Sequence, residues 1–119
     1  MLVKYKKPYK KIAMGLLSLF PEARDLKKLQ ETMHRYEENA NWQLYLWKEA
    51  EDTVGVIGVE IMEDTFVIHH LAIVPSHRSE GIVHKMIEQI RKVMGERQME
   101  SAEPTGKFVK KYLEEIHLT

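Results

Sequence analysis

The chain has 119 residues, of which 44% are apolar and 30% are charged; these proportions are typical of a globular protein, and one domain over residues 1–119 is expected. Eighteen basic residues balance eighteen acidic ones, which excludes a strong overall field for binding nucleic acid or an anionic membrane surface. The sequence contains no cysteine, so it excludes a thiol nucleophile, a thiolate zinc site and disulfides, and a reducing cytoplasm is expected.

The first forty residues predict one short strand and two helices. Residues 2–6 alternate as an extended strand would, and a helix is expected between Pro8 and Pro21 because its apolar residues fall on one face. A second helix is expected over residues 23–39 for the same reason. The N-terminal segment is basic and then apolar, as in a secretory signal peptide, but no cleavage site of small residues follows it. No apolar run approaches the roughly 20 residues that cross a bilayer.

Three strand-like runs follow, at residues 42–49, 53–61 and 65–74. They are rich in β-branched and aromatic residues, which favour strands. Short polar links join them, and such links favour antiparallel hairpins, so a meander is expected. Trp42 and Trp47 are separated by an odd number of positions and should face opposite sides of the sheet. One of them is expected in the core, and the other lines a cleft or an interface.

After Pro75 the spacing of apolar residues changes from two to about 3.6, which predicts a buried helix from Ile82 to near Gly95. Residues 98–102 are expected to form a short strand, and residues 108–113 carry the apolar stripe of a last helix. The predicted order is β-α-α-β-β-β-α-β-α. This order implies an α/β fold with a mixed sheet.

The junction between the third of these strands and the buried helix is the strongest functional signal. The first turn of a helix offers unpaired N–H groups and a partial positive charge, which favour an anionic ligand. Gly81 would let such a ligand approach the backbone. Arg78 adds a donor fork suited to phosphate, although an arginine bonding carbonyls at the strand end would look the same in sequence. Phosphate binding and a structural role therefore both stay open.

The residues of this junction resemble the acetyl-CoA signature of the GNAT N-acetyltransferase superfamily; they read LAIVPSHRSEGIVHKMI at positions 71–87. In that superfamily an Arg-x-x-Gly-x-Gly/Ala loop precedes the main helix. The order of elements also agrees. The resemblance implies that acetyl-CoA lays its pyrophosphate on backbone amides of the loop, at Arg78, Ser79, Glu80, Gly81, Ile82 and Val83. It further implies that the pantetheine arm pairs with the main chain of the strand, at Leu71, Ala72 and Ile73. A narrower similarity is to GNAT-like proteins encoded with riboflavin biosynthesis genes in bacilli.

Two features depart from the pattern of that superfamily. Val83 stands where the superfamily has glycine or alanine, and its branched side chain either crowds the pyrophosphate or points into the core. The superfamily usually adds a C-terminal hairpin, whereas residues 115–119 leave room for little more than one short strand. The C-terminal hairpin is thus expected to be short or missing. The acceptor side of the cleft would then be incomplete or completed by a partner chain, as in a homodimer.

Acetyl transfer to an amine needs a base for the amine and an acid for the leaving thiolate. The candidate bases are His70, on the strand that should floor the cleft, and Glu60 on the neighbouring strand. Regular alternation would send His69 and His70 to opposite faces, so a metal site is not expected there. Tyr112 is the candidate acid, one turn beyond the position that the superfamily uses. The histidines could equally be structural, and catalysis by proximity alone is also open.

The function expected from these features is acetyl transfer from acetyl-CoA to the amine of a small molecule or a protein. A non-catalytic acyl-CoA-binding or interaction protein, linked to riboflavin biosynthesis by the narrower similarity, is the alternative. A third possibility is a mixed-sheet domain that binds another phosphorylated ligand at Arg78 and Gly81.

Overall fold

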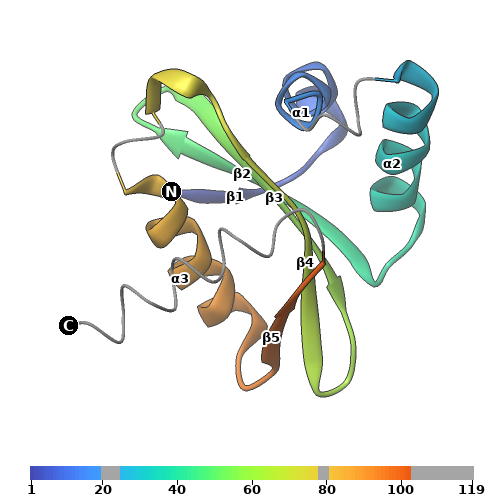
Figure 1. The fold of residues 1–119 in the computed structure, drawn as a ribbon, viewed down its shortest axis with the longest axis vertical. Helices are drawn as coiled ribbons and strands as arrows, with labels where there is room; N and C mark the ends of the chain where they lie inside the picture. Colours follow the sequence, from blue (N-terminus) through green and yellow to red (C-terminus); the bar gives the residue numbers. More distant parts are fainter. Residues whose placement is uncertain (20–24, 78–80, 103–119) are drawn as a thin grey trace.

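A five-stranded sheet with the strand order β1-β2-β3-β4-β5 runs through the molecule (Figure 1). The computed structural model describes residues 1–19, 25–77 and 81–102. The first four strands pair antiparallel, and β5 pairs parallel to β4. The strands are β1 (Leu2–Lys4), β2 (Trp42–Glu49), β3 (Asp52–Ile61), β4 (Thr65–Ile73) and β5 (Gln98–Ser101). The predicted α/β fold with a mixed sheet is confirmed, and the predicted last helix lies outside the described residues.

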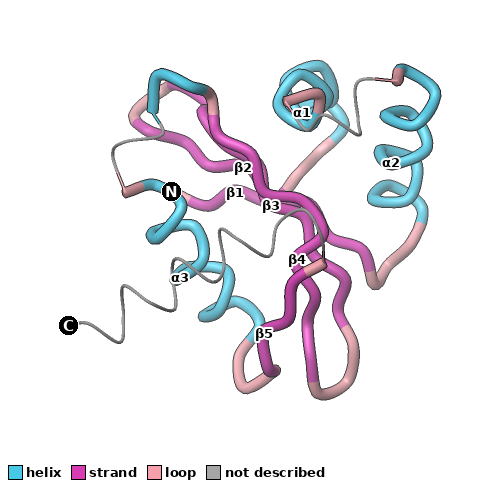
Figure 2. The backbone as a smooth tube through the Cα atoms, in the orientation of Figure 1, coloured by secondary structure: helices cyan, strands magenta, loops and turns pink. Residues whose placement is uncertain are grey.

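The helices cover both faces of the sheet, with α1 and α2 on one side and α3 on the other (Figure 2). None of the described helices is long and apolar enough to cross a membrane. The longer helices are α1 (Lys10–Leu17), α2 (Leu26–Glu38) and α3 (Ile82–Met94), and two short 3-10 helices, Lys7–Tyr9 and Pro75–His77, precede α1 and α3.

Local sequence explains where α2 and α3 begin and end. The carboxylate of Asp25 accepts a hydrogen bond of 2.9 Å from the backbone N–H of Lys27, which satisfies one of the unpaired donors at the start of α2. Buried residues then recur along α2 at helical spacing, at Leu29, Met33 and Tyr36. Helix α3 ends at Gly95, whose φ of +70° favours glycine.

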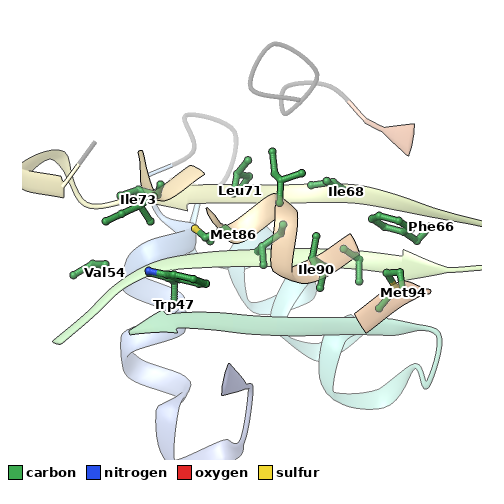
Figure 3. Close-up of a cluster of buried hydrophobic side chains, with 13 residues drawn as sticks. Trp47, Val54, Phe66, Ile68, Leu71, Ile73, Met86, Ile90 and Met94 are labelled. Carbon is green, nitrogen blue, oxygen red and sulfur yellow. The ribbon is translucent and has the colours of Figure 1, made fainter. Parts of the chain in front are cut away.

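The core consists of two clusters of buried side chains, one on each face of the sheet. The α3-side cluster is shown in Figure 3, where side chains of α3 lie against those of β4; it contains Trp47, Val54, Ile57, Val59, Phe66, Ile68, Leu71, Ile73, Ile82, Met86, Ile87, Ile90 and Met94. The α1/α2-side cluster contains Ala13, Leu16, Leu17, Leu29, Met33, Tyr36, Leu44, Leu46, Val56 and Ala72. Trp42 packs against this second cluster. The predicted placement of Trp42 and Trp47 on opposite faces is therefore confirmed.

Strand β4 contains a bulge at His69. Gly58 of β3 pairs with His70, but the next residue, Val59, pairs with Ile68, so His69 is the extra residue. The bulge breaks the alternation of side chains, and both histidines point toward the side of α1 and α2, where His69 meets Trp42 and His70 meets Tyr36. The expectation that the two histidines face opposite sides is thus wrong, because it assumed a regular strand.

Candidate active site

Strand β4 leads through a short loop into the first turn of α3. Gly81 precedes that helix in the left-handed conformation, with φ of +72°, which glycine adopts at little cost. A Cβ built there would meet no atom within 4 Å among the described residues. Arg78, Ser79 and Glu80, which the sequence assigned to the same loop, lie outside the described residues. Among the described residues, Gly81 therefore leaves room for a side chain or a ligand atom at the start of α3.

The side chains of Ile82 and Val83 both belong to the core side of α3. Ile82 is fully buried in the α3-side cluster, and Val83 is partly buried and packs against that cluster. Of the two alternatives for Val83, the structure therefore favours the one in which its side chain points into the core. This removes the steric objection to an anion beside the first turn.

Three buried residues end β4, and they differ in the face to which their side chains point. Leu71 and Ile73 belong to the α3-side cluster, and Ala72 belongs to the α1/α2-side cluster. The ladder that joins β4 to β5 covers Thr65 to Ile68, so these residues lie beyond its last pair. Leu71, Ala72 and Ile73 are each less than 9% exposed, so their side chains are committed to the core.

His70 is held against Tyr36 of α2. Its Nδ1 lies 2.5 Å from the Tyr36 hydroxyl, and the two rings meet edge to face with centroids 5.5 Å apart. Burial, together with smaller electrostatic effects of His69 and Arg35, lowers the pKa of His70 to about 4. Burial also raises the pKa of Tyr36. Both groups are therefore neutral at pH 7, and this imidazole is a weak base there.

Gly58 of β3 provides the space that Tyr36 occupies. A Cβ built on Gly58 would lie 2.0 Å from the Tyr36 hydroxyl oxygen, and Gly58 is the register partner of His70. A glycine inside a strand often marks such a close approach. The contact therefore fixes α2 against the sheet at the position of His70.

Glu60 pairs with His69 rather than with His70. The Nε2 of His69 lies 2.9 Å from a carboxylate oxygen of Glu60, and the two side chains are 22% and 30% exposed. The His69 ring stacks on Trp42, with centroids 4.2 Å apart and planes at 20°. The guanidinium carbon of Arg35 lies 4.8 Å from the centre of the same Trp42 ring. These contacts form a partly exposed polar cluster beside the bulge.

The structure brings together some of the predicted catalytic residues and not others. Glu60 and His70 lie on neighbouring strands and face the same side, whereas Tyr112 lies outside the described residues. Sequence reasoning missed the roles of Tyr36 and Arg35, which reach the cluster from α2. In the part of the chain that is described, no group of three histidine, aspartate or glutamate side chains could hold a metal ion.

Acid is expected to destabilise the fold through His70. Its pKa of about 4 in the folded chain is below the ordinary value of 6.5, so the unfolded chain binds more protons between these values. The stability that the neutral, buried imidazole contributes is present above pH 6.5 and is lost as the pH falls toward 4. The loss is on the order of 3 kcal/mol.

Urea unfolding at pH 7 and pH 4 measures this loss, with His70→Asn as the matched variant. Asparagine does not titrate, and its amide oxygen can still accept a hydrogen bond from Tyr36. The wild-type chain should lose more stability between the two pH values than the variant does. An equal loss in both proteins would show that His70 is not the responsible group.

Comparison with known proteins identifies the family. Residues 12–104 match the model of the acetyltransferase (GNAT) family. A protein of Bacillus methanolicus, described as an uncharacterized N-acetyltransferase in the lysA 3' region, is 46% identical over 112 residues, which are 93% of each chain.

Solved structures with low sequence identity share the fold. The aminoglycoside N-acetyltransferase AAC(6')-Iy, in complex with the bisubstrate analog CoA-S-monomethyl-acetylneamine, aligns with a TM-score of 0.75 at 13% identity over 98% of this chain and 88% of the other. The ribosomal-protein-alanine N-acetyltransferase of Brucella melitensis aligns with a TM-score of 0.71 at 10% identity over 96% and 89%. The matched family model and the 46% identical relative together establish that this chain belongs to the GNAT family of N-acetyltransferases.

Proposed function

We propose that the chain transfers the acetyl group of acetyl-CoA to the amine of an acceptor molecule. The observation that carries this proposal is the arrangement along β4. The polar cluster lies at the bulge of this strand, and the chain that leaves the end of the strand leads into the first turn of α3. An acyl-CoA needs both parts, because its phosphates require donors and its thioester requires a place beside an amine.

Acetyl-CoA is proposed to lie along β4 from the α3 end toward the bulge. Its pyrophosphate would contact the loop residues 78–83, and its pantetheine arm would contact the main chain of residues 71–73. A strand rises about 3.3 Å per residue, so Ile73 and His69 are roughly 13 Å apart along β4. The thioester would then come close to the bulge, where Glu60, His69 and His70 lie.

The acceptor is proposed to be an amine on a small molecule or a protein. The structural neighbours include an aminoglycoside acetyltransferase and a ribosomal-protein-alanine acetyltransferase, so both acceptor classes belong in a test panel. Glu60 and His70 stay candidates for the base, and Tyr112 stays the candidate for the acid. The single domain over residues 1–119 is part of this proposal, while the homodimer and the riboflavin link stay predictions.

A non-catalytic acyl-CoA-binding protein is the second candidate. One observation favours it: the pKa of His70 is lowered to about 4 by burial, and a base so weak removes a proton from an amine inefficiently. The packing of Val83 into the core no longer supports this candidate. The two functions share the cofactor site and differ only in turnover.

Acetyl-CoA is expected to bind the chain and raise its melting temperature, because a ligand at one hundred times its Kd adds roughly 2.7 kcal/mol to stability. Free thiol should then accumulate when amines are added. Calorimetric titration and a thiol assay with aminoglycosides and alanyl peptides measure the two steps. Binding without amine-dependent thiol release would favour the non-catalytic candidate, and no binding at millimolar acetyl-CoA would contradict both. Binding of phosphorylated ligands other than acetyl-CoA would support the third possibility.

A further inference from the structure

We infer that His69, held by Glu60, is the group that takes the proton from the acceptor amine. The inference rests on the proposed acetyl transfer and assigns its proton-removal step to His69. Sequence reasoning had placed His69 on the face of the sheet opposite to His70. Glu60 then acts as a positioning residue, because it contacts His69 and not the reacting atoms.

The hydrogen bond to Glu60 decides which nitrogen of His69 carries the proton. An ionised carboxylate only accepts hydrogen bonds, so Nε2 of His69 donates to the Glu60 oxygen across 2.9 Å. The neutral ring then carries its lone pair on Nδ1. Within residues 1–19, 25–77 and 81–102, Nδ1 of His69 has no hydrogen-bond partner. The geometry therefore leaves a proton acceptor of defined position.

Stacking fixes the plane of the His69 ring. Trp42 covers one face of it, with centroids 4.2 Å apart, and Trp42 is itself the register partner of Glu60 across β2 and β3. The tryptophan and the carboxylate thus hold the ring from two directions, which reduces the entropy lost on reaching a reactive geometry. The side chain of His69 is 22% exposed, so the ring is not closed off from solvent.

The neighbouring His70 lacks these properties. Its Nδ1 is bonded to Tyr36, and its surroundings favour the neutral ring. The charged and titratable groups around His69 come from three elements, namely Glu60 of β3, Arg35 and Tyr36 of α2, and His70 of β4. Of the two histidines, His69 is the one hydrogen-bonded to a carboxylate.

The step balances without a further reagent. The amine nitrogen attacks the thioester carbonyl carbon, and a C–N bond forms while the positively charged nitrogen loses a proton to Nδ1 of His69. The C–S bond then breaks, and its electron pair leaves with sulfur. The imidazolium returns the proton to the thiolate through water. The products are the acetylated amine and free CoA, and His69 is neutral again.

The test compares His69→Ala with His34→Ala in the full chain, using the thiol assay with acetyl-CoA and an amine that the wild-type chain acetylates. His34 is an exposed histidine of α2 outside the cluster. The His69→Ala kcat should fall about 10²-fold or more, the typical contribution of a positioned base. The KM for acetyl-CoA should stay within about twofold, and His34→Ala should keep wild-type rates. Added imidazole should restore part of the His69→Ala rate, because it supplies the missing base.

Two further variants keep the inference falsifiable if His69→Ala folds poorly. In His69→Gln the side-chain amide can still donate to Glu60 but offers no basic nitrogen, so the same fall in kcat is expected. Glu60→Gln should lower kcat by a smaller factor, and imidazole should not rescue it. Wild-type kcat in folded His69→Gln, or a 10²-fold fall in His70→Asn alone, would overturn the inference while leaving acetyl transfer intact. A wild-type chain without amine-dependent thiol release would instead overturn the proposed function and the inference together.

Discussion

Replacing Gly81 with glutamate is expected to weaken acetyl-CoA binding by roughly 10²- to 10³-fold. On the proposed assignment the new carboxylate would stand beside the pyrophosphate at the first turn of α3. Two like charges about 4 Å apart near a protein surface repel by about 4 kcal/mol, and each 1.4 kcal/mol is a factor of ten in Kd. Calorimetric titration with acetyl-CoA measures the change.

The matched control is Gly81→Ala. Both substitutions place a side chain on a residue with φ of +72°, which costs roughly 1–2 kcal/mol in a left-handed conformation. Since a Cβ at this position meets no described atom within 4 Å, the strain should be the same in both variants. Stability should therefore fall equally, while only the glutamate weakens acetyl-CoA binding to that extent. Normal acetyl-CoA affinity in Gly81→Glu would show that the pyrophosphate does not lie at this loop.

Replacing Gly58 with alanine is expected to destabilise the fold by about 2–6 kcal/mol. The new methyl group would lie 2.0 Å from the Tyr36 hydroxyl oxygen, so Tyr36 must leave its place or α2 must move away from the sheet. Overpacking of this kind costs roughly 1–3 kcal/mol. Loss of the hydrogen bond between Tyr36 and His70 adds about 1–3 kcal/mol, because it leaves a buried group without a partner.

Gly15 provides the opposite control for this substitution. It lies within α1, and a Cβ built on it meets no described atom within 4 Å. Gly15→Ala should therefore stabilise the chain by about 0.5–1 kcal/mol, since alanine is the better helix former. Urea unfolding measures both the expected loss of stability in Gly58→Ala and the expected gain in Gly15→Ala. A Gly58→Ala chain as stable as the wild type would show that Tyr36 does not occupy the space above Gly58.

The fold could be predicted from the sequence because its apolar spacing agrees with its elements. The change of period after Pro75 marks the start of α3 correctly, and the odd separation of Trp42 and Trp47 places them on opposite faces, as found. The short polar links between strands predicted the meander for a physical reason, because only antiparallel neighbours can be joined by so few residues.

The bulge could have been read from the spacing of β4 but was not. Phe66 and Ile68 alternate regularly, whereas the next residues of the same cluster are Leu71 and Ile73, so the pattern shifts by one position between 68 and 71. Such a shift indicates an extra residue in the strand. The assumption of strict alternation hid it, and with it the pairing of His69 with Glu60.

The contact of Tyr36 with His70 could not be predicted from the spacing of α2. The periodicity of that helix predicts that Tyr36 is buried, and it is. It does not say which strand residue the hydroxyl meets, because this depends on how α2 crosses the sheet. Gly58 was the available signal, since a glycine in a buried strand indicates close approach of another group.

The continuity of the meander has a consequence for how the candidate site folds. Trp42, Glu60 and His69 lie within residues 42–70, on strands joined by short turns, so little loop-closure entropy opposes their pairing. Strand β1 is instead separated from β2 in sequence by α1 and α2, and β5 is separated from β4 by α3. Contacts that are local in sequence form fastest. We therefore expect the contacts around the bulge to form early in folding, before α2 adds Tyr36 to them.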